Sequence, residues 1–218
     1  MRDYTQARKN MVDCQLRTNK LVQNEIIDAF LKIPREKFVD SSLEEVAYSD
    51  KEVSAGSGRK LIQPMLLARM IQSFETKADD VVLDVGCTTG YSSAIMADLV
   101  ATVVALESDV NLAKRATDNF ISLSIDNAVT IEGPLIEGYA AQGPYDIICV
   151  AGAIAFVPDT LIEQLAEGGR LGAVIGNGQN LGQVVKIMKK NGHVVRLNLF
   201  NAYACELPGF EKEGEFKF

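Results

Sequence analysis

The 218-residue sequence contains one histidine, His193, and four cysteines at positions 14, 87, 149 and 205, with no Cys-x-x-Cys pair. A Ser-His-Asp hydrolase needs a histidine beside its nucleophile, and the sequence also lacks a Gly-x-Ser-x-Gly elbow. The cysteine spacing indicates neither a zinc site nor a redox motif, so we expect no bound metal. Cys87 and Cys149 lie in or beside apolar runs, which predicts small core residues. We expect His193 to lie in a surface turn.

The sequence also lacks a basic excess, a secretory leader and a long apolar run. Its formal net charge at pH 7 is -7, so few cations are available to replace the counterions of a nucleic acid. The first nine residues contain no apolar signal region. No stretch approaches the ~18 apolar residues of a membrane span. We therefore expect a cytoplasmic protein with neither a nucleic-acid nor a membrane partner.

The second half of the chain alternates between short apolar runs and segments of helical periodicity. Repeated βα units of this kind predict an α/β fold, with a mostly parallel sheet and helices on both faces. The expected strands are 81–85, 102–107, 128–132, 145–150 and 170–175, and the expected helices are 91–99, 109–122 and 158–166. Gly168-Gly169 is expected to be the turn before the last of these strands. Asn191-Gly192 predicts a hairpin of strands 182–190 and 192–200, which would form an antiparallel edge.

The length and composition fit a single domain, residues 1–218, which we divide into three segments. Residues 1–76 form a helical and substrate-loop segment, with helices at 4–17, at 24–33 and from Pro64 onward. Within it, residues 54–60 predict a flexible loop. Residues 77–206 form the core. Residues 207–218 form a tail that we expect to lie over the domain through its aromatic residues Phe210, Phe216 and Phe218.

The most informative stretch begins with an apolar strand and continues into a turn bounded by two glycines. Val81-Val82-Leu83-Asp84-Val85 is followed by Gly86-Cys87-Thr88-Thr89-Gly90 and then by a helical segment starting at Tyr91. A second strand ends at Glu107, about twenty residues after Gly86. Doubly wound folds place there the acid that binds a ribose diol. Together these features predict an adenosine-containing cofactor.

The glycine pattern separates the candidate cofactors. A dinucleotide site favours Gly-x-Gly-x-x-Gly, and a phosphate loop needs Gly-Lys-Ser/Thr; neither is present. S-adenosylmethionine has a ribose and an adenine but no phosphate, so we favour it over a dinucleotide. Asp84 is then placed to face the amino-acid part of this ligand.

Several further blocks resemble the protein-L-isoaspartate O-methyltransferase family, a class I group that depends on S-adenosylmethionine. The resemblance covers nearly the whole chain and is carried by Ile33-Pro34-Arg35-Glu36-Lys37-Phe38-Val39, Ala47-Tyr48-Ser49-Asp50, Gln63-Pro64, residues 81–93, Tyr145-Asp146-Ile147-Ile148 and residues 161–170. It implies a Rossmann-like class I methyltransferase sheet with an N-terminal helical extension. It also implies that a methyl ester forms on the α-carboxylate of isoaspartyl residues in a damaged protein or peptide. Collapse of this ester to a succinimide permits repair, and S-adenosylhomocysteine is the other product.

The motifs give two sets of candidate residues. The cofactor candidates are Asp84, Val85, Gly86, Cys87, Thr88, Gly90, Tyr91, Glu107, Ser108, Gly133, Pro134 and Leu135. The substrate-loop candidates are Gly58, Arg59, Lys60, Ile62, Gln63 and Pro64. We expect loop 54–63 to close over the acceptor. No general base is assigned, because a carboxylate acceptor, with an unperturbed pKa near 3–4, is already the nucleophile at pH 7.

The sequence departs from the family pattern at three ligand positions. Ile62 stands where the family has a serine beside the substrate carboxylate, and Arg59 or Lys60 would have to supply a compensating cation. Thr88 replaces the middle glycine of the loop, so either its φ is negative or the ligand lies further out. Pro134 replaces an acid that approaches the adenine, leaving backbone groups, Glu132 or Glu137 for that contact.

These departures leave other functions open. The protein could be a methyltransferase with a different acceptor, or a binding protein that keeps the fold without repair activity. A dinucleotide-dependent reductase is a further alternative. The sequence predicts neither the oligomeric state nor the rate.

Overall fold

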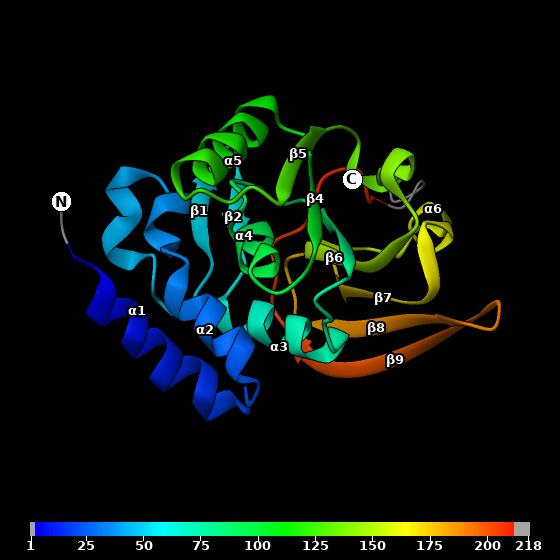
Figure 1. The fold of residues 1–218 in the computed structure, drawn as a ribbon, viewed down its shortest axis with the longest axis horizontal. Coiled ribbons are helices and arrows are strands. Elements are labelled where there is room, and N and C mark those ends of the chain that lie inside the picture. Colours follow the sequence, from blue (N-terminus) through cyan, green and yellow to red (C-terminus); the bar gives the residue numbers. More distant parts are fainter. Residues whose placement is uncertain (1–2, 212–218) are drawn as a thin grey trace.

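The computed structural model describes residues 3–211, with a seven-stranded sheet at its centre (Figure 1). The strand order is β5-β4-β3-β6-β7-β8-β9. The parallel strands are β3 (Val81–Val85), β4 (Thr102–Glu107), β5 (Ala128–Glu132), β6 (Tyr145–Ile154) and β7 (Leu165–Ile175). The antiparallel strands are β8 (Gly182–Lys190) and β9 (His193–Ala202). The predicted mostly parallel sheet with an antiparallel edge is confirmed.

The chain changes direction across the sheet between β3 and β6. From β3 it continues outward to β4 and β5, and then returns to the other side of β3 as β6. A crevice forms at such a switch point, beyond the carboxyl ends of the two strands, and it is the usual ligand site of an open α/β sheet. The loop that begins at Gly86 and the last residues of β6, after Val150, therefore border the expected site.

Helices cover both faces of the sheet, as predicted. Side chains alternate along β3, so Val82 joins one core cluster while Leu83 and Val85 join the other. The first cluster packs beneath α3 (Pro64–Phe74), α4 (Tyr91–Ala97) and α5 (Val110–Ser122). The second lies beneath α6 (Asp159–Glu163) and the 3-10 turn Leu135–Glu137. The predicted helix 158–166 is shorter than expected, because β7 already begins at Leu165.

The N-terminal helical extension packs beside α3 and α4 (Figure 1). It consists of α1 (Thr5–Met11), continued by a π-helical turn to Leu16, and α2 (Asn24–Lys32). The block after α2 forms the 3-10 turn Arg35–Phe38, followed by another turn, Ser41–Val46. Within residues 3–211, no helix is both long and apolar enough to cross a membrane.

The expected flexible loop at 54–60 is instead a β-hairpin. Strands β1 (Val53–Gly56) and β2 (Arg59–Leu61) pair antiparallel, with alternate residues buried. This alternation fixes one face of the hairpin against the domain, and the positive φ angles at 56–58 form its turn. Gly168-Gly169 also differs from the prediction. These glycines lie inside β7, at a shift in its register with β6, and do not precede the strand.

Smaller expectations hold. Cys87 and Cys149 are fully buried, and His193 is exposed beside the Asn191-Gly192 hairpin turn. Phe210 is buried against the second core cluster, whereas Phe216 and Phe218 lie outside the described residues.

Candidate functional site

The loop from Gly86 to Gly90 joins the end of β3 to α4. Its amide at Gly90 donates to the carbonyl of Cys87 over 2.8 Å, which closes the turn. Gly90 has a φ of 92°, and a Cβ there would lie 2.7 Å from Cε1 of Phe120. Only glycine fits this position, so it keeps the start of α4 close to α5.

Thr88 adopts a φ of 53°, so the alternative of a negative φ at this position is wrong. The residue lies in the left-handed region of backbone conformation. A β-branched residue in the left-handed region costs roughly 1–2 kcal/mol. Its hydroxyl donates to the carbonyl of Cys87 over 2.6 Å, and its backbone amide donates to Oε2 of Glu107 over 2.8 Å. This strained backbone conformation directs the N–H group of Thr88 toward Glu107, the acid at the end of β4.

Glu107 is wholly buried and accepts hydrogen bonds on both oxygens. Oε2 accepts from Thr88, while Oε1 accepts from the amides of Ser108 (2.8 Å) and Asp109 (3.2 Å) and from the Ser108 hydroxyl (3.3 Å). Nη1 of Arg59 completes the set at 2.7 Å. The predicted ribose acid is thus held in one orientation by backbone donors from two loops.

Asp84, the last residue but one of β3, is equally buried. Its Oδ2 accepts hydrogen bonds from the hydroxyls of Ser92 and Ser93 on α4, both at 2.6 Å, while Oδ1 has no partner among residues 3–211. Burial raises the pKa of Asp84 to about 6, against the lowering effect of the two hydroxyls. The structure places this carboxyl between β3 and α4.

The loop after β5, which holds three of the predicted cofactor residues, also approaches Glu107. The amide of Gly133 donates to the Glu107 carbonyl over 3.0 Å, which brings the loop after β5 to the same edge of the sheet. Leu135 is buried and Pro134 is exposed. Glu132 and Glu137 are also exposed, on the rim of this loop.

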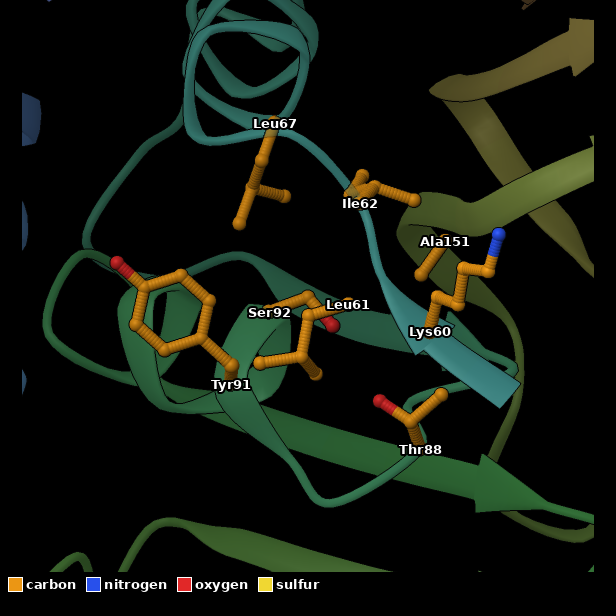
Figure 2. A pocket seen from close by; sticks show the side chains of 8 residues that line it. All are labelled: Lys60, Leu61, Ile62, Leu67, Thr88, Tyr91, Ser92 and Ala151. Carbon is orange, nitrogen blue, oxygen red and sulfur yellow. The ribbon is translucent and has the colours of Figure 1, made fainter. Parts of the chain in front are cut away.

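The substrate-loop candidates divide between the surface and the interior. Gly58 and Lys60 are exposed, Gln63 is half-buried, and Arg59, Ile62 and Pro64 are buried. Figure 2 shows a cavity where the hairpin, the loop after β3 and the end of β6 meet. It is lined by Lys60, Leu61, Ile62, Leu67, Thr88, Tyr91, Ser92 and Ala151, and its volume is about 10 Å³. That is room for roughly one water molecule.

Arg35 holds the acceptor-side segment in place, a role that the sequence reasoning missed. Its guanidinium is fully buried and donates to the carbonyls of Ala47 and Ile62, both over 2.8 Å. It also lies 4.6 Å from the centre of the Tyr91 ring, a cation–π contact. Burial raises the pKa of Tyr91 to about 12. The Pro-Arg-Glu-Lys-Phe-Val block was the available signal, because it contains this arginine.

The same block also supports the cofactor loop. The hydroxyl of Thr89 donates to the carbonyl of Phe38 over 2.5 Å. Arg8 from α1 donates to Tyr48 over 2.8 Å and to Glu36 over 3.2 Å, which ties α1 to the segment between residues 36 and 48. The N-terminal extension therefore positions the loop after β3 as well as the segment around Ile62.

Comparisons with known proteins agree with this geometry. The family described as Protein-L-isoaspartate(D-aspartate) O-methyltransferase (PCMT) matches residues 6–203. A protein-L-isoaspartate O-methyltransferase from Methanoculleus marisnigri is 35% identical over 209 residues, covering 95% of this chain and 94% of that protein. One from Koribacter versatilis is 35% identical over 192 residues, covering 88% and 86%. This chain belongs to the PCMT family.

Solved structures of the family share the fold. A protein-L-isoaspartate O-methyltransferase superposes with a TM-score of 0.82 at 26% identity, covering 93% of this chain and 66% of that chain. A candidate PCMT from Plasmodium falciparum, in complex with S-adenosyl-L-homocysteine, gives 0.76 at 22% identity and covers 95% and 99%. The second likeness supports the class I methyltransferase fold.

The residue types at the crevice fit an adenosine cofactor. Glu107 is a buried acid presented at a strand end, and Gly86 leaves room for a close approach to the backbone, since its φ of 78° and its missing side chain both favour glycine. In this conformation two side chains, those of Arg59 and Leu207, lie within 3.0 Å of the position that a Cβ on Gly86 would take.

Proposed function

We propose that this protein is an S-adenosylmethionine-dependent methyltransferase that esterifies the α-carboxylate of isoaspartyl residues in damaged proteins or peptides, for repair. S-adenosylhomocysteine would be the second product. The observation that carries the proposal is Glu107, a buried acid fixed by the Thr88 amide at the switch-point edge of the sheet. It lies in a chain whose family match spans residues 6–203.

The chain's own residues divide the cofactor contacts among three loops. Glu107 and Ser108 would hold the ribose diol, because a carboxylate accepts two hydroxyl hydrogen bonds. Residues 85–91 would border the amino-acid part, and the backbone at 133–135 would border the adenine. When bound, the cofactor supplies an electrophilic methyl group. The assignment of Asp84 to the amino-acid part requires contact through α4, because its side chain now faces Ser92 and Ser93.

The acceptor side needs alignment more than proton transfer. A carboxylate with an ordinary pKa is ionised at pH 7 and is already a nucleophile. Ile62 is 4% exposed and donates no side-chain hydrogen bond. In this structure Arg59 pairs with Glu107 at 2.7 Å, whereas the exposed Lys60 pairs with Glu52 only at 3.8 Å, so we assign the orientation of the acceptor carboxylate to Lys60. Its side chain lines the cavity beside Ile62 (Figure 2). The residues around it would act by excluding water and fixing the approach.

Residues 1–218 would act as one domain, in which segment 1–76 provides the acceptor side. The partner would be a damaged polypeptide in the cytoplasm, with no nucleic acid in the reaction.

Methyl transfer to a defined peptide tests the function. Purified protein is incubated with methyl-labelled S-adenosylmethionine and an isoaspartyl peptide, with the aspartyl peptide of the same sequence as the control. Labelled base-labile ester on the isoaspartyl peptide alone is the expected result. If binding of S-adenosylhomocysteine is measurable but neither peptide is labelled, repair is wrong and the acceptor is a different molecule.

Lys60 offers a test of the acceptor side. Lys60→Gln should raise KM for the isoaspartyl peptide about tenfold, since a charged hydrogen bond contributes roughly 1.5–3 kcal/mol. Lys51→Gln, also at an exposed lysine, is the matched control and should leave KM unchanged. Equal KM values for the two variants would remove Lys60 from the acceptor site.

A methyltransferase with a different acceptor is the second candidate. It is favoured by Ile62, a buried aliphatic side chain at the family's serine position. If this candidate is right, S-adenosylhomocysteine still binds through the same residues, but the isoaspartyl peptide is not labelled.

A further inference from the structure

The chain segment after β9 runs across the end of β6. We call residues 203–210 the closing segment. The amide of Ala153 donates to the carbonyl of Cys205, and the amide of Leu207 donates to the carbonyl of Ala153, both over 2.8 Å. The amide of Cys205 also donates to Oε1 of Glu52, just before the hairpin, over 2.6 Å. The closing segment is therefore bonded to both the sheet and the segment leading into the hairpin.

Leu207 fills the crevice at the switch point. It is 3% exposed. A Cβ on Gly86, after β3, would lie 2.9 Å from Leu207 Cδ1, and a Cβ on Gly152, in β6, would lie 2.6 Å from Leu207 Cγ. The isobutyl group thus rests on two glycines, one directly after β3 and the other within β6. This is the place where an open α/β sheet binds its ligand.

Arg59 fills the adjoining ribose position. Its Nη1 lies 2.7 Å from Oε1 of Glu107, and its Nη2 donates to the carbonyl of Gly86 over 3.3 Å. Arg59 is 7% exposed and Glu107 is fully buried, so the pair is shielded from water. The guanidinium of Arg59, from the hairpin, is therefore hydrogen-bonded to Glu107, the acid that would bind the ribose diol. The 10 Å³ cavity nearby, which Lys60, Ile62 and Thr88 help to line, has room for roughly one water molecule.

We propose that the closing segment and Arg59 form a displaceable closure of the cofactor site, so that the free protein is autoinhibited. This inference rests on the proposed function. Cofactor entry requires Leu207 to leave Gly86 and Gly152, and Arg59 to release Glu107. A ligand that binds only the open state has its affinity reduced by the fraction of molecules that are open. Loosening the closure should therefore tighten cofactor binding.

The anchors on the two sides of the crevice make this closure a connected unit. Glu52 precedes β1 and bonds Cys205, while Arg59 begins β2. Phe210, which is fully buried in the second core cluster, anchors the far end of the closing segment. Movement of the hairpin away from the sheet would break both the Arg59–Glu107 pair and the Glu52–Cys205 bond. Cofactor binding is thereby coupled to the position of the segment that precedes Lys60 and Ile62.

Hydrogen exchange of the full-length protein with and without S-adenosylhomocysteine tests the closure. Ligand binding ordinarily slows exchange across a domain. The closure predicts the opposite sign at two amides, those of Cys205 and Leu207, which should exchange at least about tenfold faster with ligand bound, while the amides of β3 slow down. Binding with unchanged or slower exchange at 205 and 207 would overturn the closure and leave the methyltransferase function standing.

A pair of variants gives the second readout, titration calorimetry with S-adenosylhomocysteine. Leu207→Ala empties the crevice and should lower Kd about tenfold. Leu161→Ala removes the same atoms from a fully buried site in the same core cluster and controls for lost stability; its Kd should stay within about twofold of the wild-type value. Equal Kd values for Leu207→Ala, Leu161→Ala and wild type would contradict the closure. If neither the wild type nor Leu207→Ala binds at millimolar ligand, the cofactor function itself is wrong, and the closure with it.

Discussion

Asp84 and Glu107 lie near the ends of two neighbouring strands, and both are wholly buried, yet their surroundings differ in kind. Glu107 accepts from three backbone amides, one hydroxyl and one guanidinium. Within the described part of the chain, Asp84 accepts only from two hydroxyls, and one of its oxygens has no partner. Position along the strand explains the difference, because Asp84 pairs in register with Ala105, two residues before Glu107, and both acids point to the same face of the sheet. Asp84 points into the core beneath α4, whereas Glu107 ends its strand where two loops present their N–H groups.

The comparison teaches that burial alone does not make a binding acid. Fixed backbone donors keep the Glu107 carboxylate in place when a ligand or Arg59 arrives or leaves. Asp84 has no such support, and burial raises its pKa to about 6. We therefore propose that Glu107 binds the cofactor directly, and that Asp84 seats α4 on β3 and acts on the amino-acid part only through that helix.

The largest expected effect comes from breaking the Arg59–Glu107 pair. Glu107→Gln leaves a buried guanidinium without its counter-charge, which should lower the free energy of unfolding by about 3–5 kcal/mol. Arg59→Gln/Glu107→Gln removes both charges and should recover part of this loss. Urea denaturation of the wild type, the two single variants and the double variant gives the coupling free energy. Additive single effects would mean that the pair is not coupled.

The next effect concerns the pH dependence of stability at Asp84. Its folded-state pKa of about 6 exceeds the ordinary 3.8, so the folded state holds the proton more tightly. The stability that this gives is full below pH 4 and is lost as the pH rises through 6. Asp84→Asn does not titrate. Its free energy of unfolding relative to wild type should therefore rise by on the order of 3 kcal/mol between pH 4 and pH 7. Denaturation at several pH values measures this, and a flat difference would show that the pKa of Asp84 is ordinary.

The smallest effect is expected at Thr88. Thr88→Gly relieves the positive-φ strain, removes the bond to Cys87 and leaves the amide that holds Glu107. Relief of the strain stabilises the fold and loss of the hydrogen bond destabilises it, so the free energy of unfolding should change by less than about 1 kcal/mol. Gly90→Ala, in the same loop, is the contrast. Its Cβ would meet Phe120, and it should cost several times more. Thermal unfolding compares the two, and a large loss in Thr88→Gly would mean that the threonine side chain supports the loop.

The sheet and its ligand edge could be predicted from the sequence, because they follow from local patterns. Buried parallel strands appear as short apolar runs, and Glu107 stands at a fixed spacing after Gly86. Local patterns also predict the burial of the cysteines at 87 and 149 and the hairpin turn at Asn191-Gly192.

The closure could not be predicted, because it depends on contacts between distant segments. Arg59 and Glu107 are 48 residues apart, and Cys205 and Glu52 are 153 apart. At the hairpin the sequence indicates a flexible loop, because the two strands have only four and three residues and the turn contains two glycines. The positive φ of Thr88 likewise accompanies the hydrogen bond from its amide to Glu107, which lies 19 residues further along the chain. No local sequence pattern reveals this contact.

Isothermal titration with S-adenosylhomocysteine tests the central claim most directly, namely that Glu107 binds the cofactor. Glu25 lies on α2, away from the cofactor loops, and is exposed, so Glu25→Gln is the matched control. We expect the wild type and Glu25→Gln to bind equally and Glu107→Gln to bind about a hundredfold more weakly, since two charge-assisted hydrogen bonds are lost. Equal affinity of Glu107→Gln and Glu25→Gln would contradict the account.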